Sequence, residues 1–226
     1  MAKPIRLDYF PRDWQRECHA NLARFSVLAL HRRAGKTELA IMELLNRALK
    51  FDKDLGLFFY IAPFLKQAKA IAWARLKQKV EPLNRFGAVE INESEGWVRF
   101  PHNGAMIRIF GADNPDAMRG VRLDFVVIDE VWNDICQPAL SDRKGGALFI
   151  GTPQGVNLFS ELYYKAQSLP DWHAALYTVH DTQAIELDEV ERLQRDMAET
   201  SFAREYLCDF SASGDDQLIS LSDAET

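Results

Sequence analysis

Apolar and polar positions divide the chain into continuous apolar runs and segments in which apolar side chains recur with helical spacing. Continuous runs are typical of strands buried on both faces of a parallel sheet, and they cover residues 24–30, 55–63, 123–131 and 146–153. A further strand is expected near 173–180. Helices are predicted over residues 37–50, 64–80, 157–168 and 188–207. This alternation predicts an α/β fold with a mainly parallel sheet and helices on both faces.

Two segments depart from the alternation. Residues 88–111 contain short alternating runs separated by Gly, Pro and Asn, which predict a small antiparallel ribbon. The polar tail, residues 211–226, has no packing pattern and is expected to be a linker or a frayed end. Residues 1–210 are therefore expected to form a single domain.

Composition and charge narrow the class of protein. The chain has 226 residues, of which 47% are apolar, enough for one sizeable core. A net charge of −6 disfavours a protein that coats nucleic acid with its whole surface, but residues 1–50 carry ten Lys and Arg against five Asp and Glu. Three well-separated cysteines without CxxC spacing indicate reduced thiols and no zinc site. Without a signal peptide or an apolar membrane span in the sequence, we expect a soluble, intracellular protein.

The first apolar run leads into "HRRAGKT", residues 31–37, and then into a predicted helix. Its last three residues match the end of the phosphate-binding (P-loop) pattern, although Leu30 stands where that pattern has its first glycine. Unpaired N–H groups and the helix dipole favour phosphate at such a helix start. Lys36 would add positive charge and Thr37 would hold Mg²⁺; the alternative is a loop glycine followed by a surface lysine. The candidate nucleotide-binding residues here are Arg33, Ala34, Gly35, Lys36, Thr37 and Glu38.

A second candidate site follows the run "FVVIDEV", which ends in the adjacent carboxylates Asp129 and Glu130. Ligands bind at the carboxyl ends of strands in parallel sheets. Asp129 is the candidate Mg²⁺ ligand, and Glu130 is the candidate catalytic residue that polarises the attacking water; the alternative is an acidic strand cap. Together with the phosphate loop, the pair predicts a P-loop NTPase fold of the ASCE, RecA-like type, with ATP and Mg²⁺ as cofactors.

Three further side chains, Arg32, Gln15 and Thr152, are candidates for the same reaction. An arginine at the γ-phosphate accelerates phosphoryl transfer, so either Arg32 or Arg33 is expected to face the phosphates while the other pairs with an acid; alternatively, both are solvated. Gln15 has the donor and acceptor groups to read adenine, or it is a surface glutamine on a helix. Thr152, at the end of the run 146–153, is either a sensor of the γ-phosphate or part of a strand-ending turn.

Six ordered motifs extend over nearly the whole chain: "WQ" (14–15), "HRRAGKT" (31–37), "YIAPFLKQAK" (60–69), "FGADNPDAMRG" (110–120), "VVIDEV" (126–131) and "PALSDRKGGALFIGTPQGVNLFSELY" (138–163). They resemble motifs of the large (motor) subunit of tailed-phage terminase, the viral DNA-packaging ATPase, in its N-terminal ATPase domain. The last motif and the arginine-bearing loop are far more specific than an isolated Gly-Lys-Thr.

The resemblance implies an ATPase that drives double-stranded DNA into a procapsid. It also implies a homo-oligomeric ring docked on the portal in the host cytoplasm, a monomer in isolation, and the portal protein and small terminase subunit as partners. By resemblance, Glu130 is the catalytic glutamate, Arg32 the arginine acting in cis, and "GTP" at 151–153 the coupling motif. Arg119 matches a position that acts in trans as an arginine finger, the alternative being a helix-end salt bridge.

Two departures from the family pattern affect what we expect. Family members have several more residues between the acidic pair and the tryptophan that matches Trp132. This segment is shorter in the present chain, which puts its turnover of ATP in question. Family members also continue into an RNase H-type nuclease domain, whereas Asp215, Asp216 and Asp223 lie in the polar tail, so no DNA cutting is expected.

DNA contact is expected at the predicted helix 64–80, through five basic residues; a solvated charged face is the alternative. These residues are Lys66, Lys69, Arg75, Lys77 and Lys79. Two other functions fit the motifs less completely: a helicase-like DNA-dependent ATPase, and a regulatory module that binds nucleotide without turnover.

Overall fold

A single sheet of eight strands forms the centre of the computed structural model, which describes residues 7–53, 55–113, 120–130, 140 and 143–212. The strand order is β3-β4-β5-β2-β6-β7-β1-β8. The pairings from β5 through β8 are parallel, and both pairings of β4 are antiparallel. The strands are β1 (Phe25–Leu30), β2 (Leu57–Ala62), β3 (Glu90–Asn92), β4 (Trp97–Phe100), β5 (Ala105–Gly111), β6 (Phe125–Asp129), β7 (Gly146–Gly151) and β8 (Trp172–Tyr177).

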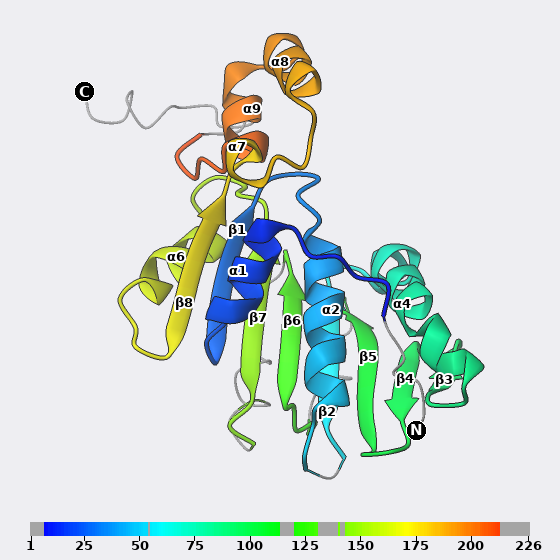
Figure 1. The fold of residues 1–226 in the computed structure, drawn as a ribbon. Coiled ribbons are helices and arrows are strands. Elements are labelled where there is room, and N and C mark those ends of the chain that lie inside the picture. The colour runs from blue at the N-terminus through cyan, green and yellow to red at the C-terminus, as the bar shows by residue number, and fades with distance from the viewer. Residues whose placement is uncertain (1–6, 54, 114–119, 131–139, 141–142, 213–226) are drawn as a thin grey trace.

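Helices cover both faces of this sheet, as the alternation of strands and helices predicts (Figure 1). One face carries α1 (Asp13–Asn21), α2 (Lys36–Leu49) and α4 (Ala74–Arg85), which share one apolar cluster with the sheet. The opposite face carries α6 (Leu158–Ala166), whose Tyr163 and Ala166 belong to a second cluster. The predicted α/β architecture is confirmed.

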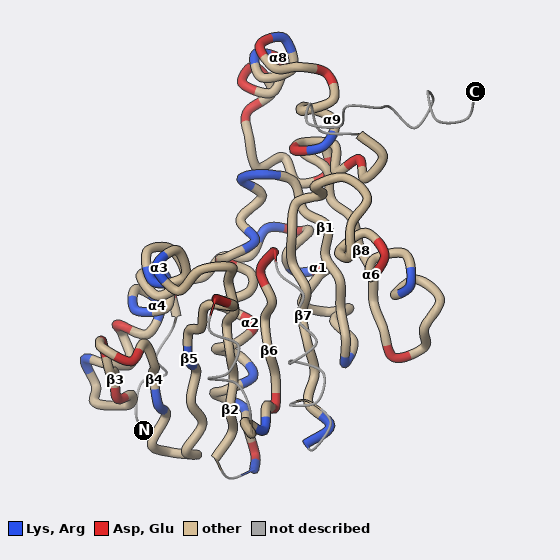
Figure 2. Tube along the Cα trace, turned by 180° about the vertical axis from the view of Figure 1, so that it is seen from behind, with Lys and Arg blue, Asp and Glu red and all other residues tan. Residues whose placement is uncertain are grey.

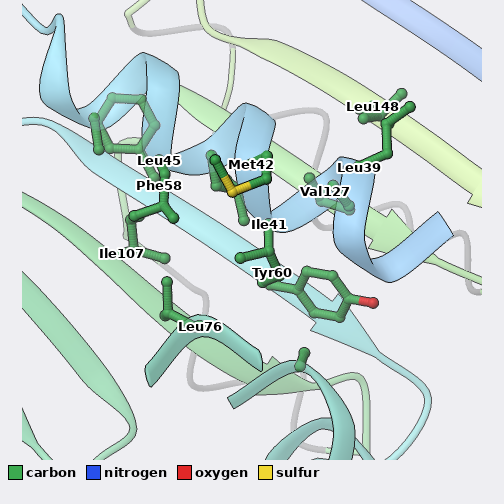
Figure 3. Packing of buried hydrophobic residues seen from close by; sticks show 14 of the residues in the cluster. Leu39, Ile41, Met42, Leu45, Phe58, Tyr60, Leu76, Ile107, Val127 and Leu148 are labelled. Carbon is green, nitrogen blue, oxygen red and sulfur yellow. The ribbon is translucent and has the colours of Figure 1, made fainter. Parts of the chain in front are cut away.

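Helix α2 shows why the apolar spacing of residues 37–50 produces this packing. Its buried side chains Leu39, Met42 and Leu45 lie against strand residues such as Phe58 and Val127 (Figure 3). Each such side chain stabilises the fold by about 1.5–3 kcal/mol on leaving water. This burial fixes the start of α2, and with it the phosphate loop, against the carboxyl ends of the central strands.

The predicted ribbon and the predicted basic helix both differ in detail from expectation. Strands β3 and β4 form the ribbon, but β5 also pairs in parallel with β2 and so belongs to the main sheet. The basic helix consists of α3 (Leu65–Ala68), a π-helical segment at Lys69–Trp73, and α4. It extends past the expected end at residue 80, because Leu83 is buried in the core despite the proline at position 82.

A third group of helices lies beyond the carboxyl ends of β1 and β8 (Figure 1). It contains α7 (Val179–Thr182), α8 (Leu187–Asp196) and α9 (Glu199–Tyr206), and its small core is formed by Val179, Val190, Phe202 and Tyr206. This group therefore stands over the edge of the sheet at which the phosphate loop begins. In the described part of the chain, no helix combines the length and apolar character that a membrane crossing requires.

Candidate active site

The candidate residues from three strands meet at one edge of the sheet. Strands β6, β7 and β1 are adjacent and parallel, so Glu130, Thr152 and the phosphate loop follow neighbouring strand ends. The Lys36 amine donates to the Thr152 hydroxyl at 2.5 Å and lies 3.5 Å from the Glu130 carboxylate. Acidic residues at the end of β6 and basic residues of the loop after β1 are visible at this edge (Figure 2). Lys36 therefore connects the phosphate loop with the ends of β7 and β6.

The phosphate loop has the backbone shape of a strand-to-helix turn. Arg33 and Gly35 have left-handed conformations, with φ of 67° and 100°, and α2 begins directly after Gly35. Glycine adopts this conformation without the steric cost that a Cβ imposes. The carbonyl of Ala34 accepts a hydrogen bond from the Arg12 guanidinium at 3.1 Å. The N–H groups at the start of α2 remain available to an anion.

Gln15 lies beside this loop and is not a surface residue. Its side chain is buried on α1, and its Oε1 accepts a hydrogen bond from the Arg12 backbone N–H at 3.0 Å. A Cβ placed on Gly35 would lie 3.5 Å from Gln15 Nε2. The alternative of a solvent-exposed glutamine is therefore wrong, and the amide borders the phosphate loop.

Asp129 has one oxygen engaged and one without a partner. The Tyr60 hydroxyl donates a hydrogen bond to Oδ2, whereas Oδ1 is buried and has no hydrogen-bond partner within the described residues. Burial raises the pKa of Asp129, and the hydrogen bond from Tyr60 partly offsets this. Burial and Asp129 raise the pKa of Tyr60, and the nearby Thr37 side chain acts in the opposite direction. An orphaned carboxylate oxygen close to a threonine hydroxyl is the kind of oxygen set that Mg²⁺ takes, so these residues fit the implied cation.

Glu130 differs from its neighbour Asp129 in backbone and in exposure. It has a left-handed φ of 63°, and its N–H donates to the Ile150 carbonyl at 3.0 Å. Its side chain is 40% exposed, whereas the Oδ1 atom of Asp129 is enclosed by the protein. The turn of the backbone after β6 therefore directs the two carboxylates into different surroundings, and Glu130 is the one more accessible to water.

The two loop arginines also differ. The Arg32 guanidinium forms an ion pair with Glu205 of α9 at 2.8 Å, and this hydrogen bond raises the pKa of Arg32. Both arginines line a pocket of about 360 Å³ together with Glu189 and Arg192 of α8, and no ion pair of Arg33 is found among the described residues. In this structure it is Arg32 that pairs with an acid, and neither guanidinium is bonded to Lys36 or Glu130 by any described contact.

Glu38 and the basic helix contact each other and not the phosphate loop. The Glu38 carboxylate pairs with Lys79 at 2.5 Å and with Arg75 at 3.3 Å. Lys79 is buried, so the expectation that it contacts DNA is wrong. Lys77 pairs with Glu93 at 2.9 Å, and Lys69 donates to the Ser94 carbonyl. The absence of acids from residues 64–80 is misleading, because four of the five basic residues there are paired with acids or carbonyls from other elements, namely Lys69, Arg75, Lys77 and Lys79.

Two site residues were missed from the sequence, Tyr60 and His31. His31 is fully buried at the end of β1; its Nδ1 lies 2.6 Å from the Arg32 carbonyl and its Nε2 lies 2.5 Å from the Thr182 hydroxyl. Burial lowers the pKa of His31 to about 4, so the ring is neutral near pH 7. The signal for both residues is a polar side chain inside or directly after a buried apolar run.

Some candidates lie outside the described residues. These are Arg119, the segment after Glu130 that includes Trp132, and the tail acids Asp215, Asp216 and Asp223. Across the described ranges, no three His, Cys, Asp or Glu side chains come together in a group suited to a metal ion.

A mainly parallel sheet with a phosphate loop after β1 and an acidic pair after β6, with β7 between these two strands, defines a P-loop nucleoside-triphosphatase fold of the ASCE type. Residues 29–226 match the family described as terminase large subunit, T4likevirus-type, N-terminal. The chain belongs to this family.

Relatives agree with this assignment. The large terminase subunit of Thermus virus P23-45 is 34% identical over 180 residues, which cover 70% of this chain and 36% of that protein. The large terminase subunit of Escherichia phage T5 is 27% identical over 203 residues, covering 83% of this chain and 44% of the relative. The solved ATPase domain of the Thermus phage P74-26 large terminase has a TM-score of 0.79 and 26% identity, covering 90% of this chain and 95% of that domain. The chain thus spans less than half the length of these curated relatives.

Proposed function

We propose that this chain is the ATP-hydrolysing part of a motor that packages double-stranded viral DNA into a procapsid. The observation that carries the proposal is the position of Lys36 between Thr152 and Glu130, at the edge of the sheet where the phosphate loop begins. Relatives named as terminase large subunits support the motor, and the large terminase of a thermophilic bacteriophage, solved with ADP and with ATP-γ-S, supports a nucleotide as ligand.

In this proposal the start of α2 and Lys36 bind the phosphates, and Gln15 contacts the adenine. Thr37 and Asp129 hold Mg²⁺, which when bound neutralises phosphate charge. Lys36 must exchange its contact with Glu130 for the phosphates, and this exchange leaves the exposed Glu130 carboxylate to polarise water. Thr152 gives up its bond to Lys36 when the γ-phosphate binds and regains it when the γ-phosphate is lost, which is how it acts as a sensor.

An arginine supplies positive charge to the γ-phosphate. Arg32 is the residue assigned in cis, and it must leave Glu205 to reach the nucleotide; Arg33 is the alternative. Arg119 is assigned the role of a finger acting in trans on a neighbouring subunit. A lone subunit lacks that second arginine, so its turnover is expected to be weak.

The partners follow from the same assignment. We propose double-stranded DNA as the transported ligand, a homo-oligomeric ring as the active state, and the portal protein and small terminase subunit as partners at a procapsid in the host cytoplasm. A motor that moves along any DNA needs backbone contacts only. The proposal assigns no DNA cleavage to this chain.

Phosphate release from purified protein tests the enzymatic part of the proposal. Wild type is expected to release phosphate from ATP in Mg²⁺, faster when DNA is added, and Glu130→Gln is expected to release none while still binding nucleotide. Equal background release by both proteins would instead support a nucleotide-binding module without turnover. Strand separation of a DNA duplex would favour the helicase-like function.

A further inference from the structure

We propose that Tyr60 is a positioning residue for the cation site, whose hydroxyl fixes Asp129 so that its second carboxylate oxygen is presented to the metal ion. This inference rests on the proposed function, because it concerns the same site.

The position of Tyr60 in the sheet places its hydroxyl at the site. Tyr60 lies on β2 directly opposite Val127 of β6 in the parallel register. Asp129 follows Val127 by two residues and therefore lies on the same face of β6. The Tyr60 ring packs in the apolar cluster beside Ile41 of α2, and its oxygen points away from the apolar side chains (Figure 3). Only 1% of the residue is exposed to solvent.

The hydrogen bond from Tyr60 accounts for the free oxygen of Asp129. A phenol has one proton to donate and lone pairs to accept. Tyr60 donates its proton to Asp129 Oδ2, and the Thr37 side chain lies near the same hydroxyl. With Oδ2 engaged, the orientation of the carboxylate is set and Oδ1 is left buried without a partner among the described residues. Partners of this type, one step removed from a metal, orient the ligands and raise metal affinity.

Core packing alone does not explain a tyrosine at this position. The adjacent strand residues Phe58 and Phe59 are buried phenylalanines, so an apolar ring is sufficient elsewhere on β2. A buried hydroxyl stabilises nothing unless its hydrogen bonds are made. Here its hydrogen bond goes to Asp129, one of the two residues assigned to the cation.

The test compares Tyr60→Phe with wild type and with Tyr163→Phe. Tyr163 is a control because it is buried on α6, on the opposite face of the sheet. Mn²⁺ affinity of the ADP complex is measured by electron paramagnetic resonance, and ADP affinity without metal by calorimetry. Tyr60→Phe is expected to weaken Mn²⁺ binding by about 10- to 100-fold and to leave metal-free ADP binding unchanged. Tyr163→Phe is expected to change neither quantity.

Other outcomes separate the two proposals. Unchanged Mn²⁺ affinity in Tyr60→Phe would overturn the inference, because the hydroxyl would then have no effect on the cation site. Failure of that variant to fold would also overturn it, because the hydroxyl would then be needed for folding only. In a variant that already carries Asp129→Asn, Tyr60→Phe should cause no further loss of Mn²⁺ affinity, because Tyr60 is proposed to act through Asp129. An additional loss as large as that in wild type would contradict a role of Tyr60 in positioning Asp129. A wild type that binds Mn²⁺ and ADP but releases no phosphate would refute the proposed ATPase and leave the role of Tyr60 standing.

Discussion

Arg32 of the phosphate loop is bonded to Glu205 of α9 through both side chain and backbone. The guanidinium lies 2.8 Å from the carboxylate, and the Arg32 N–H donates to the Glu205 carbonyl at 2.8 Å. The contact joins residues 173 positions apart and holds the small helical group above the sheet to the loop. Nucleotide that draws Arg32 toward the γ-phosphate must therefore break the side-chain half of this contact.

Replacement of Arg32 tests which loop arginine acts in hydrolysis. Arg32→Ala is expected to lower kcat by about 10³-fold or more while ADP affinity stays near that of wild type, because the arginine acts on the transition state. Arg33→Ala is the matched control and should keep most of the turnover. Steady-state phosphate release and calorimetry give the two quantities. If Arg33→Ala alone abolishes turnover, Arg33 is the arginine that acts in cis.

Removal of the competing acid should have the opposite effect. Glu205→Gln keeps the size of the side chain and removes the charge that holds Arg32. The Arg32 side chain is 63% exposed, so the pair contributes no more than about 1 kcal/mol, and the expected gain in kcat/KM is at most about fivefold. A fall in kcat/KM in a variant of normal thermal stability would mean that Glu205 assists the reaction.

We expect the ion pairs of Glu38 with Arg75 and Lys79 to stabilise the fold. Glu38→Gln leaves the Lys79 ammonium, with a side chain only 8% exposed, without its carboxylate. The free energy of unfolding is expected to fall by about 3 kcal/mol, measured by denaturant titration. Glu90→Gln, which breaks the exposed pair with Arg99, should cost much less. Loss of ADP affinity without loss of stability would show instead that Glu38 contacts the ligand.

Buried His31 makes stability depend on pH. Its pKa is lowered from 6.5 to about 4 by burial, so between these values the unfolded chain binds a proton that the folded chain does not. Stability is therefore lost as pH falls through this window, by at most about 3 kcal/mol from this group. His31→Gln should flatten the dependence of the unfolding free energy on pH between 6.5 and 4, whereas the exposed His102→Gln should not. Parallel curves for His31→Gln and wild type would exclude this effect.

The sequence predicts the sheet and its helices because their signals are local. A continuous apolar run such as residues 125–128 is incompatible with an exposed strand, and the spacing of Leu39, Met42 and Leu45 needs one buried helix face. The same logic places Lys36 and the acidic pair at one edge, because the carboxyl ends of parallel strands meet there.

Contacts between distant segments are not predictable in this way. The position of Glu38 directly after the phosphate loop suggests a residue of the nucleotide site, but its carboxylate forms an ion pair with Lys79. Lys79 is distant in the sequence, where it resembles a surface lysine. Tyr60 resembles another aromatic core residue until its hydroxyl is found on Asp129. Each role depends on which strands and helices become neighbours, and a single sequence does not contain that information in any local pattern.

Binding of ATP and ADP to the intact protein in Mg²⁺, followed by isothermal titration calorimetry, tests the central claim most directly. Wild type is expected to bind both nucleotides. The Lys36→Ala variant, which must be folded, lacks the amine between Thr152 and Glu130 and is expected to bind neither nucleotide measurably. Equal affinity of the two proteins, or no binding by folded wild type, would contradict a nucleotide site at this edge of the sheet.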